Sequence, residues 1–290
     1  MAEAQLTPPT ANNGLLAVFQ RRYLLRLLVR REINARYQGS FLGLLWSYIN
    51  PLAQFLVYWA IIGGVLNLHD EVPNFPIHLF AGLVIVHFFT ETFGAGTRSI
   101  VRNKSIVVKM PLPREMFPVA TMLVSLYHVG PQLVVLVIAC VLSGWTPDPV
   151  GMLAMVIALL MIMAIGTAVA LVFSVANVFF RDFGNIVNVL QMLVRFGVPM
   201  IYPYSMVESR FGRAADFYLL NPLADAVLLF QRAFWVGVPD KDHSKSDIMA
   251  EHLPDNLLLL GLGMLGVGLV MLVGAQLIFN KLDNKIPERL

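Results

Sequence analysis

Residues 150–180 read VGMLAMVIALLMIMAIGTAVALVFSVANVFF and contain no charged side chain. This run is longer than the ~20 apolar residues that a helix needs to cross a hydrocarbon core of about 30 Å. Lipid offers no hydrogen-bond partner to a backbone N–H or C=O group, so a segment of this kind crosses a membrane as an α-helix. The stretch therefore predicts a transmembrane helix and sets the fold class of the chain.

The same pattern recurs on both sides of this run. Over the whole chain, 57% of the residues are hydrophobic and 13% are charged, compared with roughly 25% charged residues in an average soluble domain. We therefore expect an all-α integral membrane protein with six transmembrane helices in a single transmembrane domain, residues 39–280. Besides 150–180, the expected spans are 41–66, 77–97, 117–142, 183–207 and 256–280.

Lysine and arginine gather in four of the segments that flank or separate these spans. They are dense in residues 15–38 and 98–114, and they recur at Arg181 and in 281–290. Basic residues near span ends mark the cytoplasmic side, so we expect a multi-pass protein of the plasma membrane with both termini in the cytoplasm. Residues 1–14 lack the apolar core of a signal peptide and are expected to be disordered, while 281–290 would form a cytoplasmic tail.

Three segments outside the spans have helical patterns of their own. Residues 15–38 are rich in both Leu and Arg, with arginines on every side, which favours an interface helix wedged between membrane and partner. Residues 99–109 predict a short amphipathic helix, either a solvated basic loop or a coupling helix on a cytoplasmic motor subunit. The outer region 208–255 contains an apolar pattern too short to span, so we expect two re-entrant gate helices broken near Asn221-Pro222.

An aromatic stripe marks the first span. Phe41, Tyr48, Phe55 and Trp59 share one face of an ideal helix, while Tyr58 lies on another. Two interpretations are open. The rings either pack against lipid and protein, with belt residues near the interfaces, or they form a conduit wall that stacks on sugar rings without gripping any one hydroxyl pattern.

Two ionisable residues lie within the spans. Glu91 shares a helix face with His87 and Gly94 in the second span, and Arg195 lies in the fifth. Such residues are costly in a membrane and face a protein interior or a wet cavity. They either line such a cavity, form one structural ion pair, or lie shallow enough for their charged ends to reach the interface. A proton-driven pump would need more such groups.

The chain has no motif for nucleotide or metal chemistry. No Gly-Lys dipeptide occurs, so the phosphate-binding loop G-x-x-x-x-G-K-[ST] is absent. The G-x-G-x-x-G at Gly261, Gly263 and Gly266 falls inside an apolar run, where small residues favour helix packing. The single cysteine, Cys140, supports neither a disulfide nor a metal cluster. We therefore expect no cofactor on this chain, no metal site, no nucleic-acid partner and no catalytic activity.

Several short motifs follow one another in a distinctive order. They are 36–43 (RYQGSFLG) with Trp46 and Pro51, the loop 103–118, Phe180-Arg181-Asp182, Pro199-Met200-Ile201-Tyr202, and Asn221-Pro222 with Arg232. Through them the chain, from about residue 20 to 285, resembles the type 2 ABC exporter permeases, in the branch that exports bacterial polysaccharides such as O-antigen.

The resemblance implies the permease subunit of an ATP-driven exporter in the bacterial inner membrane. Its cargo would be a polysaccharide linked to polyprenyl diphosphate, and the Val-, Ala- and Gly-rich composition suggests an actinobacterial lipid-linked galactan. The partners would be a second copy of the chain and two copies of a cytoplasmic nucleotide-binding ATPase, which would hold the ATP and Mg.

The resemblance also assigns roles to individual residues. The substrate channel would be lined by Phe41, Tyr48, Phe55, Tyr58, Trp59, His87, Phe88 and Glu91. Coupling to the ATPase would involve Arg98, Ser99, Arg102, Asn103, Lys104 and Lys109. The outer gate would include Asn221, Pro222 and Arg232.

Two alternatives stay open on the sequence. The first keeps the fold but exports a drug or a lipid. The second is a polytopic enzyme that acts on lipid-linked sugars, which would need acidic residues clustered at one membrane face. The outer acidic residues are instead scattered, at Asp216, Asp225, Asp240 and Asp242.

Overall fold

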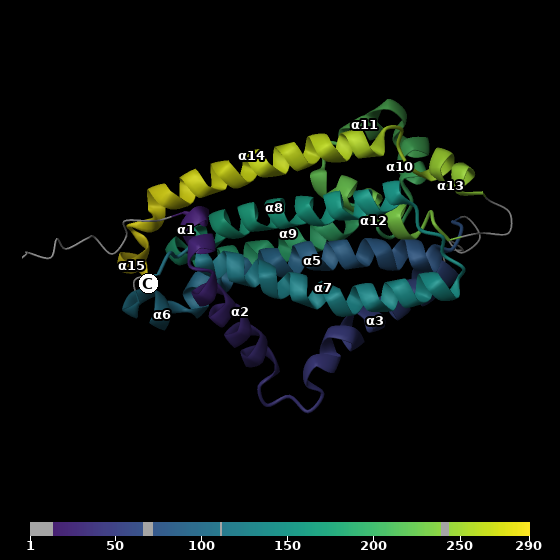
Figure 1. The fold of residues 1–290 in the computed structure, drawn as a ribbon. Helices are drawn as coiled ribbons and strands as arrows, with labels where there is room; N and C mark the ends of the chain where they lie inside the picture. The colour runs from purple at the N-terminus through teal and green to yellow at the C-terminus, as the bar shows by residue number, and fades with distance from the viewer. Residues whose placement is uncertain (1–13, 66–71, 111, 239–243) are drawn as a thin grey trace, which may run out of the picture.

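The computed structural model describes residues 14–65, 72–110, 112–238 and 244–290. In this part of the chain every element of regular secondary structure is a helix (Figure 1). The expected disordered segment, except Gly14, lies outside the described residues, as do Asp240 and Asp242.

Within the described ranges, four helices are long and apolar enough to cross a membrane. They lie alongside one another in Figure 1 and correspond to the second, third, fourth and sixth expected spans. The prediction of an all-helical membrane protein is confirmed to this extent. The four helices are α5 (Phe75–Arg102), α7 (Met116–Leu142), α8 (Pro149–Phe179) and α14 (Leu257–Asp283).

Small residues set the distance between α5 and α8. A Cβ added to Gly96 of α5 would lie 2.5 Å from the Cβ of Ala170 in α8, which is closer than two carbon atoms can approach. Gly166 of α8 faces Thr92 of α5, where an added Cβ would lie 3.1 Å from a side-chain methyl group. Close approach of this kind supplies the van der Waals contact that holds helices together in a membrane.

The glycine motif in α14 makes one close contact. A Cβ on Gly261 would lie 2.5 Å from Cδ1 of Leu229, in α12 (Pro222–Phe234). Gly263 and Gly266 have no such neighbour within 4 Å. Gly261 therefore serves the packing of α14 against α12, whereas the other two glycines leave the helix surface open.

The first expected span, 41–66, is divided. The chain turns at Gly39 and Gly43, whose φ angles of 75° and 48° suit glycine. Helical structure therefore starts at Gly43, and Phe41 precedes it. The elements that follow are η1 (Gly43–Leu45), α3 (Trp46–Tyr58) and the wider, π-helical η2 (Trp59–Val65).

The fifth expected span, 183–207, is also divided. Helix α9 (Phe183–Phe196) ends at Gly197, and Pro199 and Pro203 follow. Proline has no N–H to continue the helical hydrogen bonds, so the chain resumes as a separate helix, α10 (Tyr204–Phe211). The first and fifth runs are thus shorter helices than the other four, and a six-span topology stays a prediction.

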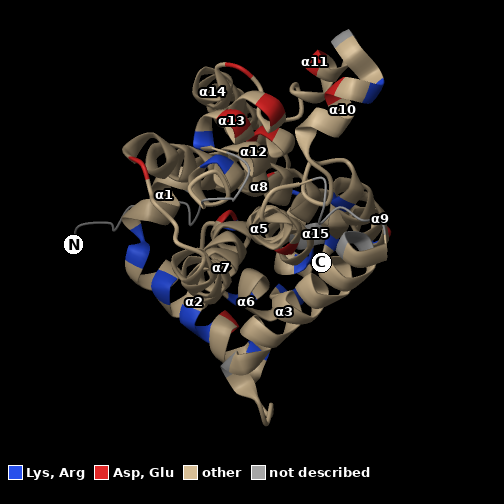
Figure 2. Ribbon diagram, turned by 90° about the vertical axis from the view of Figure 1, so that its right-hand side faces the viewer, with Lys and Arg blue, Asp and Glu red and all other residues tan. Residues whose placement is uncertain are grey.

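Short helices gather at the two ends of the long ones (Figure 1). We call the end that carries α1, α6, α15 and the start of α2 the basic end, because Figure 2 shows lysine and arginine along α2. The opposite end carries α10, α11 and α13, and we call it the loop end. The bounds are α1 (Leu15–Gln20), α2 (Arg22–Tyr37), α6 (Lys104–Lys109), η3 (Gly212–Ala214), α11 (Ala215–Tyr218), α13 (Lys245–His252) and α15 (Ile286–Arg289).

Candidate functional site

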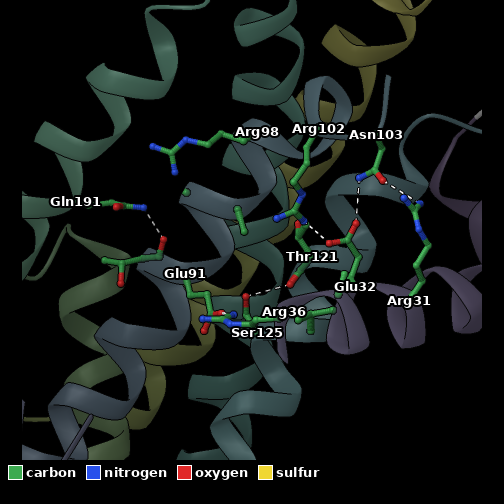
Figure 3. Close-up of a pocket in the computed structure, with 15 residues that line it drawn as sticks. Arg31, Glu32, Arg36, Glu91, Arg98, Arg102, Asn103, Thr121, Ser125 and Gln191 are labelled. Carbon is green, nitrogen blue, oxygen red and sulfur yellow. Dashed lines mark hydrogen bonds and ion pairs between the residues drawn. The ribbon is translucent and has the colours of Figure 1, made fainter. Parts of the chain in front are cut away.

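A cavity of about 580 Å³ lies toward the basic end, between α2, α5, α7 and α9 (Figure 3). Its volume falls in the range of small-molecule binding sites. Charged and amide side chains dominate the lining, and none of the lining side chains is aromatic. The lining residues are Arg31, Glu32, Ala35, Arg36, Thr90, Glu91, Gly94, Ala95, Arg98, Arg102, Asn103, Thr121, Val124, Ser125 and Gln191.

Helix α5 supplies the long wall of the cavity. Glu91, Ala95, Arg98 and Arg102 follow one another at intervals of three or four residues, so they lie on one face of the helix. Gly94 on the same wall makes room for a side chain from α9. A Cβ there would lie 2.5 Å from Nε2 of Gln191.

Glu91 is the acidic centre of the inner part of the cavity. Its carboxylate forms an ion pair with Arg36, at the end of α2, and lies 3.1 Å from Nδ1 of His128 in α7. His87, one turn earlier on α5, has its Nε2 3.8 Å from the same carboxylate. Three helices therefore meet through one intramembrane carboxylate.

A chain of polar contacts extends from Glu91 toward α3. The hydroxyl of Tyr37 lies 3.0 Å from Nε2 of His128 and hydrogen-bonds Ser47 of α3. Gln132 of α7 has its Nε2 2.9 Å from Nδ1 of His87. Most of the polar side chains in this part of the molecule therefore bond to one another, whereas the buried Oε1 of Gln132 has no hydrogen-bond partner among the described residues.

A second set of contacts ties α2 to the end of α5. Arg102 forms an ion pair with Glu32, and the Nδ2 of Asn103 donates to the same carboxylate at 3.1 Å. The Oδ1 of Asn103 accepts from Nη1 of Arg31 at 3.1 Å. Asn103, only 3% exposed, therefore joins α2 to the turn between α5 and α6.

Arg98 and Gln191 form the wall nearest α9. Nη2 of Arg98 donates to the carbonyl oxygen of Gly184 at 3.0 Å and to Oδ1 of Asn188 at 2.6 Å. Nε2 of Gln191 donates to the carbonyl oxygen of Thr90 at 2.5 Å. Arg98 thus bonds to neutral oxygens, and Figure 3 places it on the same side of the cavity as Gln191.

Two smaller pockets adjoin this cavity and share residues with it. One contains Arg36, Glu91, His87 and His128 together with residues at the start of α3. The other contains Thr90 and His87 together with Gln54, Tyr58 and Arg195. Pockets that share residues therefore follow α5 from the basic end to the face where α3 and α9 meet it, and the last of them is lined by both polar and apolar side chains.

The residues predicted to line the channel occupy different environments. His87, Glu91 and Tyr58 line these connected pockets. Phe55 packs edge-on against Phe80, with ring centroids 5.3 Å apart, and Phe88 is buried in the core. The remaining three are exposed or half-buried: Phe41, Tyr48 and Trp59. A channel role for the aromatic residues stays a prediction.

The residues predicted to couple to an ATPase are divided between two helices. Arg98, Ser99 and Arg102 lie in the last turns of α5, and Asn103 stands at the turn between α5 and α6 without a side-chain capping bond. The expected single helix 99–109 is thus interrupted at Asn103. Lys104 bonds to the carbonyl oxygen of Leu290, and Lys109 ends α6 on the exposed surface.

The predicted gate residues hold α12 in place at the loop end. Oδ1 of Asn221 accepts from the backbone N–H of Leu223 at 3.1 Å, which caps the helix that Pro222 starts. Arg232 makes two hydrogen bonds to Asp148, at 3.0 and 2.9 Å, and so links α12 to the start of α8.

The charge of Arg232 also affects Asp148. Partial burial by itself raises the pKa of this carboxyl. The hydrogen bonds and positive charge of Arg232 outweigh that effect, and they hold the pKa of Asp148 below its usual value of 3.8.

The sequence did not single out four of the residues that line these pockets: Arg31, Glu32, His128 and Gln191. Arg36 was noted only within a motif. One signal was available for Gln191, because Asn188, Gln191 and Arg195 form a polar stripe on an otherwise apolar helix. A similar signal was available for His128, because Thr121, Ser125, His128 and Gln132 recur at intervals of three or four residues along α7.

Comparisons with known proteins support a transport function for this architecture. The family model described as "ABC-2 type transporter" matches residues 23–235. The O-antigen export system permease protein RfbA of Myxococcus xanthus is 29% identical over 93% of this chain and 96% of its own length. An RfbA of Klebsiella pneumoniae is 25% identical over 91% and 94%. The polysialic acid transport protein KpsM of Escherichia coli is 23% identical over 72% and 80%.

Proposed function

The chain belongs to the ABC-2 type transporter family, and on that premise we propose that it is the permease subunit of a polysaccharide exporter. The observation that carries the proposal is the match, over nearly the whole chain, to O-antigen export permeases. Pockets along α5 that hold charged and amide side chains support it, because ionisable residues among apolar helices face a wet cavity. The chain itself is a membrane component without catalytic activity.

We further propose six spans with both termini in the cytoplasm. The segment α3–η2 and helix α9 would complete the set of spans, locally thinning the bilayer because they are short. The basic end would face the cytoplasm, since lysine and arginine near span ends favour that side. The loop end, with the re-entrant gate helices, would face outward.

Energy for export would come from a separate ATPase bound at the basic end, one on each of two permease copies. Helix α6 presents Val108 and Lys109 on the exposed surface there, which suits a docking contact. The second copy would cover exposed apolar side chains on α3 and α9. On α9 these are Ile186, Val189, Met192, Leu193 and Phe196.

The cargo we propose is a glycan joined to a polyprenyl diphosphate lipid. Depletion of this chain in its native bacterium tests the idea directly. Full-length lipid-linked glycan should accumulate in the inner membrane, and an ATPase should co-purify with the tagged chain. Depletion without any glycan accumulation would instead favour a drug or lipid as the cargo.

A further inference from the structure

The cavity toward the basic end has an excess of positive charge. Among its lining residues, four arginines face two glutamates, Glu32 and Glu91. Arg36 and Arg102 each hold one of these carboxylates. Nη2 of Arg98 donates its hydrogen bonds to two neutral oxygens, those of Gly184 and Asn188. The positive charge of Arg98 is therefore not matched by a carboxylate among the residues that the structure describes.

The lining has the features of an anion site more than those of a site that stacks on sugar rings. Sugar rings are commonly held by aromatic faces, and no aromatic side chain lines this cavity. Guanidinium groups, in contrast, present a planar fork of N–H donors that matches phosphate oxygens in pairs. Both N–H groups of Nη2 of Arg98 are engaged, so Nη1 and Nε of Arg98 and the second N–H of Gln191 remain as separate donors on one wall, beside the positive charge of Arg98.

We propose that this cavity binds the diphosphate that joins the glycan to its lipid carrier, with Arg98 as the principal contact and Gln191 beside it. This inference rests on the proposed function, since only a lipid-linked cargo brings a diphosphate to the chain. The site adjoins the pockets that lead along α5. The anionic end of the cargo would therefore be held where the polar lining begins.

The test measures binding of a short lipid diphosphate to the intact complex. The permease with its ATPase is placed in nanodiscs, with excess ADP so that the nucleotide sites are filled. Farnesyl diphosphate is titrated in parallel with farnesyl monophosphate and farnesol, and uptake by empty nanodiscs is subtracted. Arg98→Gln should weaken diphosphate binding by about tenfold or more, because a charge-assisted hydrogen bond is lost, and should leave farnesol uptake unchanged.

Two further variants make the result specific. Arg98→Lys keeps the charge but has fewer and differently placed N–H donors, so it should bind with intermediate affinity. Arg26→Gln removes an exposed arginine of α2 that does not line the cavity, and it should bind as the wild type does. Co-elution of the ATPase with each variant shows that the complex is folded and assembled.

Competition separates the sources of the anion. Inorganic pyrophosphate should displace farnesyl diphosphate, whereas phosphatidylglycerol should not. Equal displacement by phosphatidylglycerol would make the cavity an ordinary anionic-lipid site and overturn the proposal. So would equal affinity for farnesyl diphosphate and farnesol, or equal losses in Arg98→Gln and Arg26→Gln.

Failure of this site is distinguishable from failure of the proposed function. If the glycan does not accumulate on depletion of the chain, the export function is wrong whatever the binding data show. If it does accumulate, but Arg98→Gln binds the diphosphate as well as the wild type, only the site is wrong.

Discussion

Arg36, near the end of α2, forms an ion pair with Glu91, which lies in the interior of the long helix α5. The side chain of Glu91 is 10% exposed and that of Arg36 is 46% exposed, so the arginine reaches inward from the surface to a buried carboxylate. His128 of α7 contacts the same carboxylate. The helix expected to contact the ATPase is thereby attached to two helices that surround the proposed cargo path.

This ion pair predicts a measurable coupling energy. Glu91→Gln or Arg36→Gln alone should lower the free energy of unfolding by about 1–3 kcal/mol, between the values for exposed and buried pairs. The double variant should lose less than the sum of the two, because neither charge is left without its partner. Thermal unfolding of the detergent-purified chain measures this, with Arg26→Gln as a matched control. Strictly additive losses would contradict an energetic link between the two residues.

The close contact of α5 with α8 predicts a steric effect. Gly96→Ala should destabilise the chain by about 1–3 kcal/mol, because the new methyl group overlaps Ala170 and forces the helices apart. Gly130→Ala, on α7, is the control, since a Cβ there has no neighbour within 4 Å. A lower unfolding temperature is expected for the first variant only. Equal unfolding temperatures would mean that the helices adjust without cost.

How far the sequence predicted this fold depended on where glycine and proline interrupt each apolar run. The run 150–180 became α8, Pro149–Phe179, because a continuous apolar stretch without proline in its interior has one favourable structure in lipid. The run 183–207 did not stay whole. Gly197 and the prolines after it ended α9, and hydropathy alone does not register such breaks.

The candidate site was predictable only in part. Glu91 stood out as an ionisable residue inside a span, and it does face a polar cavity. Its partner did not stand out. From the sequence, Arg195 is the candidate partner of Glu91. In the structure Arg36, which is far from Glu91 in the sequence, makes the ion pair. The direction in which α2 folds back on α5 decides this, and no local pattern encodes that direction.

Asp148 and Arg232 predict a pH dependence at the loop end. Because the pKa of Asp148 is lowered in the folded chain, the stability it contributes is present above its usual pKa of 3.8 and is lost as the pH falls through the lower, folded value. Asp148→Asn should cost about 1 kcal/mol at neutral pH, as expected for a two-bond pair that is partly exposed.

Unfolding temperatures measured from neutral to acidic pH test this. The difference between wild type and Asp148→Asn should stay constant down to about pH 5 and then shrink as the carboxylate is protonated. Asp255→Asn, at an exposed position, is the matched control for the loss of one carboxylate. A difference that grows on acidification would have the wrong sign for a lowered pKa.

Helix α6 predicts where the ATPase docks. Val108 is 57% exposed on this helix, whereas its neighbour Val107 is buried. Val108→Glu should therefore reduce recovery of the ATPase with the tagged chain while membrane insertion stays normal, because an apolar contact is replaced by a charge. Leu220→Glu, exposed at the loop end, is the control. Equal ATPase recovery with both variants would remove α6 from the docking surface.

The aromatic residues of α3 and η2 predict a separation of export from stability. Tyr48→Ala with Trp59→Ala should slow glycan export and leave the unfolding temperature nearly unchanged, because both rings are at least partly exposed.

Phe55→Ala should lower the unfolding temperature and leave export per assembled complex nearly unchanged. Its ring packs on Phe80, so truncation should cost about 1–3 kcal/mol of stability. Export of a radiolabelled glycan into the outer compartment, normalised to the amount of assembled complex, measures the first effect, and thermal unfolding measures the second. Unchanged export in the Tyr48 and Trp59 double variant would show that the aromatic face packs against lipid or a second copy rather than against the cargo.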